Sequence, residues 1–128
     1  MTPSLRSTLV PLLAIALAAC SGVPTVLGLT AEFGEAEMIL AGETRTYEDG
    51  LAVTLDRVDD SRCKPDVQCI WAGELAPVLT LRGGTLAGAQ TVSLGTTRTP
   101  RAQVGDYSLA LDSATERSAR VIVSRVPR

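Results

Sequence analysis

Short apolar runs separated by turn residues fill the sequence from Glu37 onward, and this pattern restricts the fold more than any other feature. Leu51, Val53 and Leu55 alternate with small or polar residues, which predicts a strand with one buried face and one solvated face. No stretch of this region has the spacing of an amphipathic helix. The sequence therefore predicts an all-β fold, a small single-domain β-sandwich, with a small β-barrel as the alternative.

Turn residues bound most of the expected strands. Asp49-Gly50 is a strong hairpin signal, and Gly83-Gly84 ends a longer strand. Pro77 lies within that strand and lacks an amide proton, which predicts an edge position or a bulge. Residues 95–105 are expected to form a polar loop. The expected strands are Glu37–Leu40, Thr44–Glu48, Leu51–Asp56, Trp71–Leu81, Gln90–Leu94, Asp106–Leu111 and Ala119–Val126, with the last two paired across a turn at Asp112–Ser118.

The amino terminus differs in composition from the rest of the chain. Arg6 is its only charged residue, and the apolar run Leu9–Ala19 is too short for a membrane span, which needs about 20 residues. A basic start, a short apolar stretch and small residues at its end are typical of an export signal. The ending Leu-Ala-Ala-Cys resembles the bacterial lipobox, whose cysteine is lipidated and becomes the first mature residue. An ordinary signal peptide that contains a cysteine is the alternative.

The lipobox interpretation divides the chain into three parts. Residues 1–19 are expected to be a lipoprotein signal peptide, residues 20–36 a lipid anchor and tether, and residues 37–128 the β-sandwich. Cys20 would carry acyl chains such as palmitate, and each buried CH₂ would contribute about 0.8 kcal/mol of membrane affinity. Because no aspartate follows this cysteine, lipoprotein sorting favours the outer membrane of a Gram-negative cell, facing the periplasm. A strand near Val26–Leu29 is a further expectation for the tether.

Cys63 and Cys69 remain after the lipobox, in a chain expected to reach an oxidising compartment. A disulfide between them is the natural interpretation, and loop entropy gives it roughly 2.4 kcal/mol of stabilisation. Redox-active pairs usually have the spacing Cys-x-x-Cys on a βαβ frame, which is absent here. Zinc would lack ligands, because the chain has no histidine.

The segment around these cysteines carries the most specific pattern in the chain. Ser61-Arg62-Cys63 and Cys69-Ile70-Trp71-Ala72-Gly73 resemble the signature Asp-Ser-Arg-Cys-Pro…Cys-x-Trp-Ala-Gly of a family of small bacterial exported proteins and lipoproteins of unassigned function. Lys64 stands where the signature has proline, and Pro65 follows one position later. The strand pattern resembles the family over most of Glu37–Val126. The resemblance implies an exported β domain and assigns no mechanism.

A loop braced in this way suits either a structural role or recognition. For recognition, Arg62, Lys64 and Asp66 would make the contacts and Trp71 would anchor the base of the loop. Arg62 is also expected to pair with a nearby aspartate, and Gly73 is expected to allow close passage of the backbone.

Two further hypotheses concern the same loop. A serine-protease inhibitor would use loop 62–69, with Arg62-Cys63 as the better bond because Pro65 follows Lys64. A calcium site would need six to eight oxygens, for which the candidates are Asp59, Asp60, Asp66 and Glu74, although their spacing fits no EF-hand.

The remaining composition favours a non-enzymatic protein. The absence of histidine excludes His-based catalytic triads, and a net charge of −2 gives no footprint for nucleic acid. We expect no catalytic residues, cofactor or metal, and we expect a membrane, through Cys20, and an envelope protein as partners. Tyr47, Trp71 and Tyr107 are expected in the core or at a sheet edge. A solvated face is expected for the carboxyl-terminal arginines Arg117, Arg120, Arg125 and Arg128.

Overall fold

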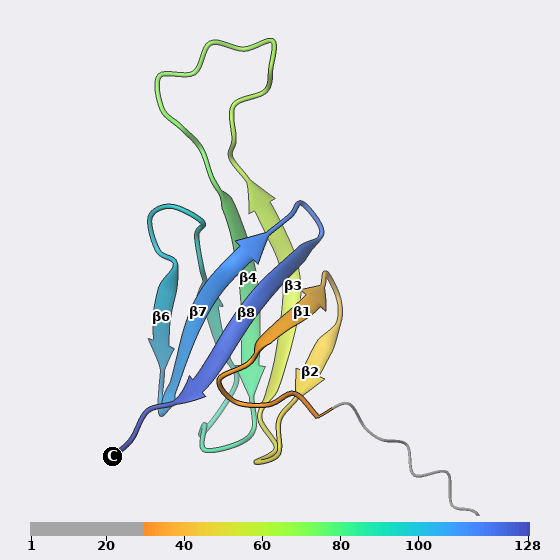
Figure 1. The fold of residues 1–128 in the computed structure, drawn as a ribbon, viewed down its shortest axis with the longest axis vertical. Coiled ribbons are helices and arrows are strands. Elements are labelled where there is room, and N and C mark those ends of the chain that lie inside the picture. Colours follow the sequence, from red (N-terminus) through yellow and green to blue (C-terminus); the bar gives the residue numbers. More distant parts are fainter. Residues whose placement is uncertain (1–29) are drawn as a thin grey trace, which may run out of the picture.

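The computed structural model describes residues 30–128, which form two antiparallel four-stranded sheets packed face to face (Figure 1). The strands are β1 (Ala36–Leu40), β2 (Thr44–Thr46), β3 (Ala52–Asp60), β4 (Leu75–Arg82), β5 (Gln90–Ser93), β6 (Arg101–Val104), β7 (Tyr107–Ala114) and β8 (Ser118–Arg125). One sheet has the order β1-β8-β7-β6 and the other β2-β3-β4-β5. Neither sheet closes on itself, so the predicted β-sandwich is confirmed over its barrel alternative. The described residues contain no helix, and hence none that could cross a membrane.

The core lies between the sheets and takes alternate side chains from the central strands. Val53 and Leu55 of β3 are fully buried, as the alternation predicts, and Leu79 of β4 lies opposite Leu55 in the ladder. Burying each such side chain contributes about 1.5–3 kcal/mol relative to an exposed position. Tyr47 and Tyr107 are also buried, as predicted, and they are the largest side chains in the core.

The packed region begins before the range 37–128 expected for the domain. Ala31 is buried and its amide donates to the Thr46 carbonyl at 2.9 Å. The Phe33 ring stacks on Tyr47 with centroids 4.8 Å apart. The predicted signal peptide, the lipidated Cys20 and the strand near Val26–Leu29 lie outside the described residues.

The strand containing Pro77 differs from its prediction in two ways. It begins at Leu75 and not at Trp71, and it lies between β3 and β5, so the predicted edge position is wrong. The proline is tolerated because it lies one residue beyond the last β4–β5 pair, at the end of that ladder. The register shift is in β3, between Leu55 and Arg57, and not at the proline.

The carboxyl-terminal half contains a strand that the sequence analysis assigned to a loop. β6 lies within residues 95–105 and forms the edge of its sheet, where a short polar strand is stable because one side is solvated. β7 also continues to Ala114, because a register shift between Leu111 and Ser113 accommodates its polar end. The predicted turn at Asp112–Ser118 is therefore too long. The carboxyl-terminal arginines are exposed, as expected.

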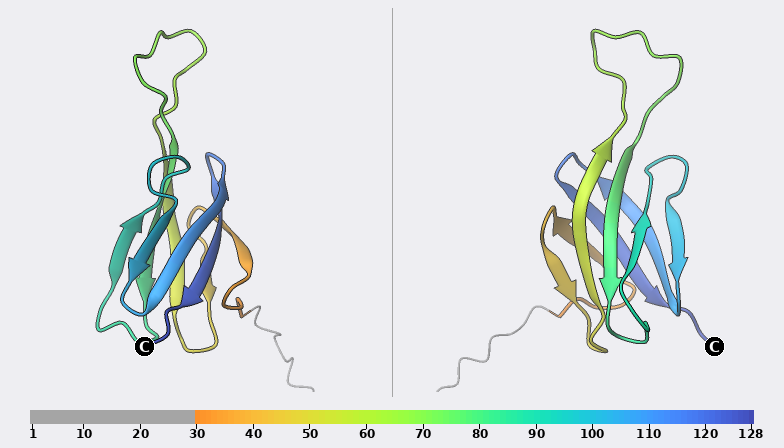
Figure 2. Two further views of the ribbon diagram at one scale, coloured as in Figure 1. Left: turned by 60° about the vertical axis from the view of Figure 1, so that its left-hand side comes forward. Right: turned by 180° about the vertical axis from the view of Figure 1, so that it is seen from behind.

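β3 and β4 hold residues 61–74 beyond one end of the sandwich. We call this segment the finger; it stands clear of both sheets in all three views (Figures 1 and 2). The described chain begins, in orange, at the opposite end of the sandwich. The ladder agrees, because the residue that Ala31 contacts lies on β2 next to the start of β3, whereas the finger follows the end of β3.

Candidate recognition site on the finger

The two arms of the finger are joined at a neck formed by Ser61 and Glu74. The Ser61 amide and hydroxyl each donate to the Glu74 carbonyl at 3.0 Å, and the same hydroxyl accepts from the Glu74 amide at 3.0 Å. A Cβ at Gly73 would overlap the Ser61 carbonyl, so only glycine fits this crossing. The predicted close passage at Gly73 is confirmed, and the neck holds the arms at a fixed separation.

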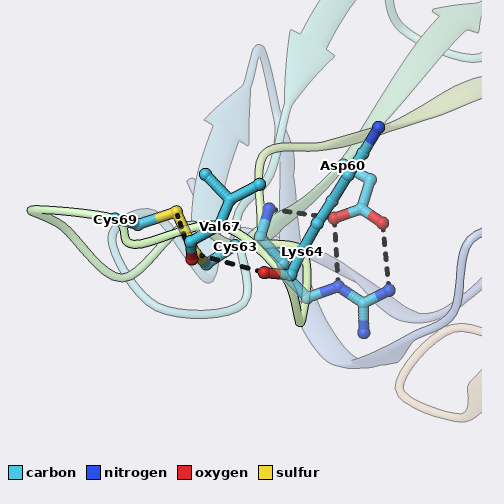
Figure 3. Close-up of a disulfide and its surroundings, with 6 residues drawn as sticks. Asp60, Cys63, Lys64, Val67 and Cys69 are labelled. Atoms are coloured by element: carbon cyan, nitrogen blue, oxygen red, sulfur yellow. Dashed lines mark hydrogen bonds and ion pairs between the residues drawn. A yellow bond between two sulfur atoms is a disulfide. The ribbon is translucent and has the colours of Figure 1, made fainter.

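Farther out along the finger than the neck, the predicted Cys63–Cys69 disulfide is confirmed, with the two Cα atoms 5.9 Å apart (Figure 3). The Val67 amide donates to the Lys64 carbonyl at 3.1 Å, which closes a turn with Pro65 in the position that favours its fixed φ. The Val67 carbonyl oxygen lies 2.8 Å from Cys63 Sγ. This approach is a contact and not a hydrogen bond, because a bonded sulfur has no proton to donate. The outer part of the finger is thus a closed ring.

Arg62 fastens the base of the finger. Asp60 Oδ1 accepts from Arg62 Nε at 3.0 Å and from its amide at 2.9 Å, and Oδ2 accepts from Nη2 at 3.0 Å. These hydrogen bonds from Arg62 hold the pKa of Asp60 below its usual value. Arg62 Nη2 also contacts Glu116 Oε1 at 3.1 Å, in the turn between β7 and β8. The predicted pairing with a nearby aspartate is confirmed.

Glu74 fastens the other arm. Its Oε2 accepts from the backbone amides of Thr97 and Arg98, at 2.8 and 3.0 Å. These two amides, with Arg98 contributing most, lower the pKa of the Glu74 carboxyl. The carboxylate also fills the space beside Gly95, where a Cβ would lie 2.5 Å from Oε2. Both arms are therefore bound to loops of the sandwich.

Three exposed apolar side chains lie on the finger. Val67 is 56%, Ile70 95% and Trp71 65% exposed, and the other large exposed apolar residues of the described chain are Met38 and Leu40 on β1. The prediction that Trp71 packs in the core or at a sheet edge is wrong, because β4 begins only at Leu75 and leaves the indole outside the sandwich.

The residues expected to make contacts divide into two groups. Lys64 and Asp66 are exposed in the turn, and within residues 30–128 neither forms an ion pair. Arg62 is exposed but bound within the protein, as described above. Ile70 and Val67 were missed by the sequence analysis. The available signal for exposed apolar side chains was the pair of adjacent apolar residues after Cys69, because the stretch around them lacks strand alternation.

The carboxylates considered for calcium do not gather into one site. Asp59 pairs with Arg57 at 2.9 Å, Asp60 is occupied by Arg62, and Glu74 is occupied by backbone amides. Among residues 30–128 no cluster of three or more metal-binding side chains is found.

No protein family, curated protein or solved structure matches the chain. The resemblance to exported proteins around Cys63 and Cys69 therefore stays a prediction.

Proposed function

We propose that this protein is a cell-envelope lipoprotein that acts as a non-enzymatic binding module, with the finger as its recognition element. The observation that carries this proposal is the exposure of Val67, Ile70 and Trp71 on the finger, whose two arms are both bound to the sandwich. Keeping apolar side chains in water has a cost, and partner surfaces are the common reason for it. A rigid loop also loses little conformational entropy on binding.

Polar groups lie at the base of the finger. A hollow of about 430 Å³ beside the finger is lined by Asp60, Arg62, Lys64 and Glu116 among others. An apolar centre with a polar, solvated rim is the usual arrangement of protein–protein interfaces. The finger and the turn between β7 and β8 would together form the contact surface.

The cell-envelope location is supported by the lipobox ending at Cys20 and by the Cys63–Cys69 disulfide, since disulfides persist in exported proteins. Nine residues lie between Cys20 and Thr30, so the two are at most about 35 Å apart along an extended chain. Because the described chain begins opposite the finger, a lipid on Cys20 favours an orientation in which the finger points away from its own membrane. In a Gram-negative cell the proposed site is the outer membrane, facing the periplasm.

Crosslinking in intact cells tests the binding role. Replacing residues 62–72 by a glycine–serine segment of equal length keeps the neck and the sandwich, and we expect it to abolish the adducts formed by the native protein. The control is Met38→Ala, which removes an exposed apolar side chain from β1 and should leave the adducts unchanged. Recovery of the same adducts from a folded finger-replacement variant would contradict the proposal.

A further inference from the structure

The Cys63–Cys69 disulfide lies farther from the sandwich than the contacts that hold the two arms of the finger. The neck at Ser61 and Glu74 and the ion pairs of Arg62 lie between it and the sheets, and no sulfur atom takes part in them. The tip of the finger, residues 63–72, contributes no side chain to the buried core. Opening the disulfide would therefore leave both arms attached and the sandwich intact.

The conformation of the tip, by contrast, depends on the disulfide. Within the described part of the chain, residues 62–73 form one backbone–backbone hydrogen bond, from the Val67 amide to the Lys64 carbonyl. The apolar side chains of the tip are exposed, so packing does not hold them either. A tip that becomes mobile on reduction regains its entropy in the folded protein as well as in the unfolded chain. The loop entropy of the disulfide then stabilises the tip and not the sandwich.

The two sulfur atoms differ in their surroundings, although both cysteines are exposed. The Val67 and Lys64 carbonyl oxygens lie 2.8 and 3.6 Å from Cys63 Sγ, whereas the Val67 oxygen is 3.9 Å from Cys69 Sγ (Figure 3). These oxygens would repel a thiolate that approaches Cys63, so Cys69 is the sulfur open to attack. A Cys63 thiol, once released, would have a hydrogen-bond acceptor beside it in the Val67 carbonyl. Exposed disulfides are also the class that is readily reduced.

We propose that the Cys63–Cys69 disulfide is a reversible redox switch of the finger, opened by a protein dithiol and closed by the oxidised form of such a dithiol. In the opening step, a thiolate of the dithiol bonds to Cys69 Sγ, and the bond between the two cysteines breaks with its electron pair on Cys63, which takes up a proton. The second thiol of the dithiol then displaces Cys69 as a thiol. Two electrons and two protons reach the finger, and the dithiol becomes a disulfide. Closing is the same exchange in reverse.

The inference rests on the proposed binding role and adds its regulation. With the disulfide formed, Val67, Ile70 and Trp71 are presented in one arrangement, and little conformational entropy is lost on binding. With the disulfide reduced, the tip must be ordered by the partner, so affinity falls. The two cysteines are in this role the substrate of a redox protein and not a redox catalyst, in keeping with a spacing that differs from Cys-x-x-Cys.

The purified protein tests whether the switch acts on the tip alone. On reduction with dithiothreitol, we expect the thermal midpoint to fall by less than about 5 °C. The amplitude of nanosecond motion of Trp71, measured by fluorescence anisotropy, should at least about double. Cys63→Ser combined with Cys69→Ser should reproduce the reduced protein, and Gln68→Ser, which keeps the disulfide, should match the native one. A larger fall of the midpoint, or unchanged motion of Trp71, would overturn the inference.

Thioredoxin is the protein dithiol for the second measurement. It should reduce the disulfide of the folded protein, and a disulfide that it leaves intact would overturn the switch. A mixed disulfide of the native protein with glutathione, trapped by acid and located by mass spectrometry, should lie on Cys69 more often than on Cys63. An equal or greater share on Cys63 would contradict the order of attack.

Crosslinking in intact cells separates this inference from the proposed function. The folded double serine variant should form at least about tenfold fewer of the native adducts, because its tip is mobile. If this variant forms the native adducts in full while finger replacement abolishes them, the regulation fails and the binding role stands. If the adducts survive finger replacement, the binding role itself fails.

Discussion

Tyr47 buries a hydroxyl group in the core without a hydrogen bond. Within residues 30–128 its Oη is the buried side-chain polar atom that lacks a partner, and only 1% of the residue is exposed. An unsatisfied buried hydroxyl costs about 1–3 kcal/mol. Tyr47→Phe keeps the ring stacked on Phe33, so we expect it to raise the free energy of unfolding in urea by about 1 kcal/mol.

Tyr107 provides the matched control for this substitution. Its Oη donates to Asp49 Oδ2 at 2.6 Å and accepts from the Thr85 amide at 3.0 Å. Tyr107→Phe removes both hydrogen bonds and leaves the Thr85 amide without this partner, whereas Asp49 keeps its ion pair with Arg125, so the substitution should lower stability by about 1–3 kcal/mol. Loss of stability in both variants would show that the Tyr47 hydroxyl has a stabilising role.

The same hydroxyl makes stability depend on alkaline pH. Burial, followed by the charge of Glu37 and partly offset by Arg45, raises the pKa of Tyr47 from 10.0 to about 12. Below pH 10 both the folded and unfolded states keep the proton. Between pH 10 and 12 the unfolded state loses it first, so stability falls as pH rises through this range. The unfolding free energies of the native protein and of the more stable Tyr47→Phe should therefore diverge across this range, because the variant lacks this titration, and parallel curves would contradict the assignment.

Gly73 determines how the finger joins the sheet. Because a Cβ there would overlap the Ser61 carbonyl, Gly73→Ala must displace one arm of the neck. We expect a loss of about 1–3 kcal/mol in unfolding free energy and a change in the fluorescence of Trp71, the single tryptophan. Gly88→Ala is the control, since a Cβ at Gly88 meets no atom within 4 Å. A loss equal to that of Gly88→Ala would show that the neck is not constrained.

Side chains close the outer edge of β1. Arg45 Nη2 donates to the Met38 carbonyl at 2.8 Å, and Glu43 Oε2 accepts from the Leu40 amide at 3.3 Å. Arg45 Nη2 and Glu43 Oε2 lie 3.2 Å apart, so the two side chains form an ion pair. Backbone groups that would otherwise be free to pair with another strand are thereby occupied, which is how natural edge strands avoid association.

The central elements were predictable because burial imposes a period of two on their sequences. Val53 and Leu55 show this period clearly. β6 and the end of β7 carry it weakly, because an edge or a bulge relaxes the demand for buried alternate residues. The start of β4 was missed for a different reason, since Trp71 is a strong strand former that no neighbouring strand covers.

At the scale of the molecule, the disulfide and the Arg62–Asp60 pair were predictable from residues close together in sequence. Glu116, which completes the base of the finger, is 54 residues from Arg62 and could be assigned only from the sheet topology. The partners of Glu74 could likewise be assigned only from the topology. Thr97 and Arg98 lie in the loop after β5, and β5 pairs with β4, at whose start Glu74 lies. Local sequence patterns indicate the disulfide-closed loop, and only the fold shows which residues of the sandwich hold its two arms.

Membrane attachment is a property of the whole protein that one substitution tests. Cys20→Ser removes the sulfur that the predicted lipobox would acylate, so the variant should accumulate as the unprocessed precursor with residues 1–19 retained. Mass spectrometry and membrane fractionation of native and variant proteins measure this outcome. Ser21→Ala, next to the cysteine, serves as a processing control. An unchanged mature mass in Cys20→Ser would refute lipidation.

The neck at Ser61 and Glu74 also separates two kinds of evolutionary change. Residues 63–72 are exposed and contribute no side chain to the buried core. Their sequence can therefore diverge, or be exchanged as a cassette, without altering the residues that fold the sandwich. Homologous domains that share the neck glycine and the cysteines could carry fingers of different specificity on one unchanged scaffold.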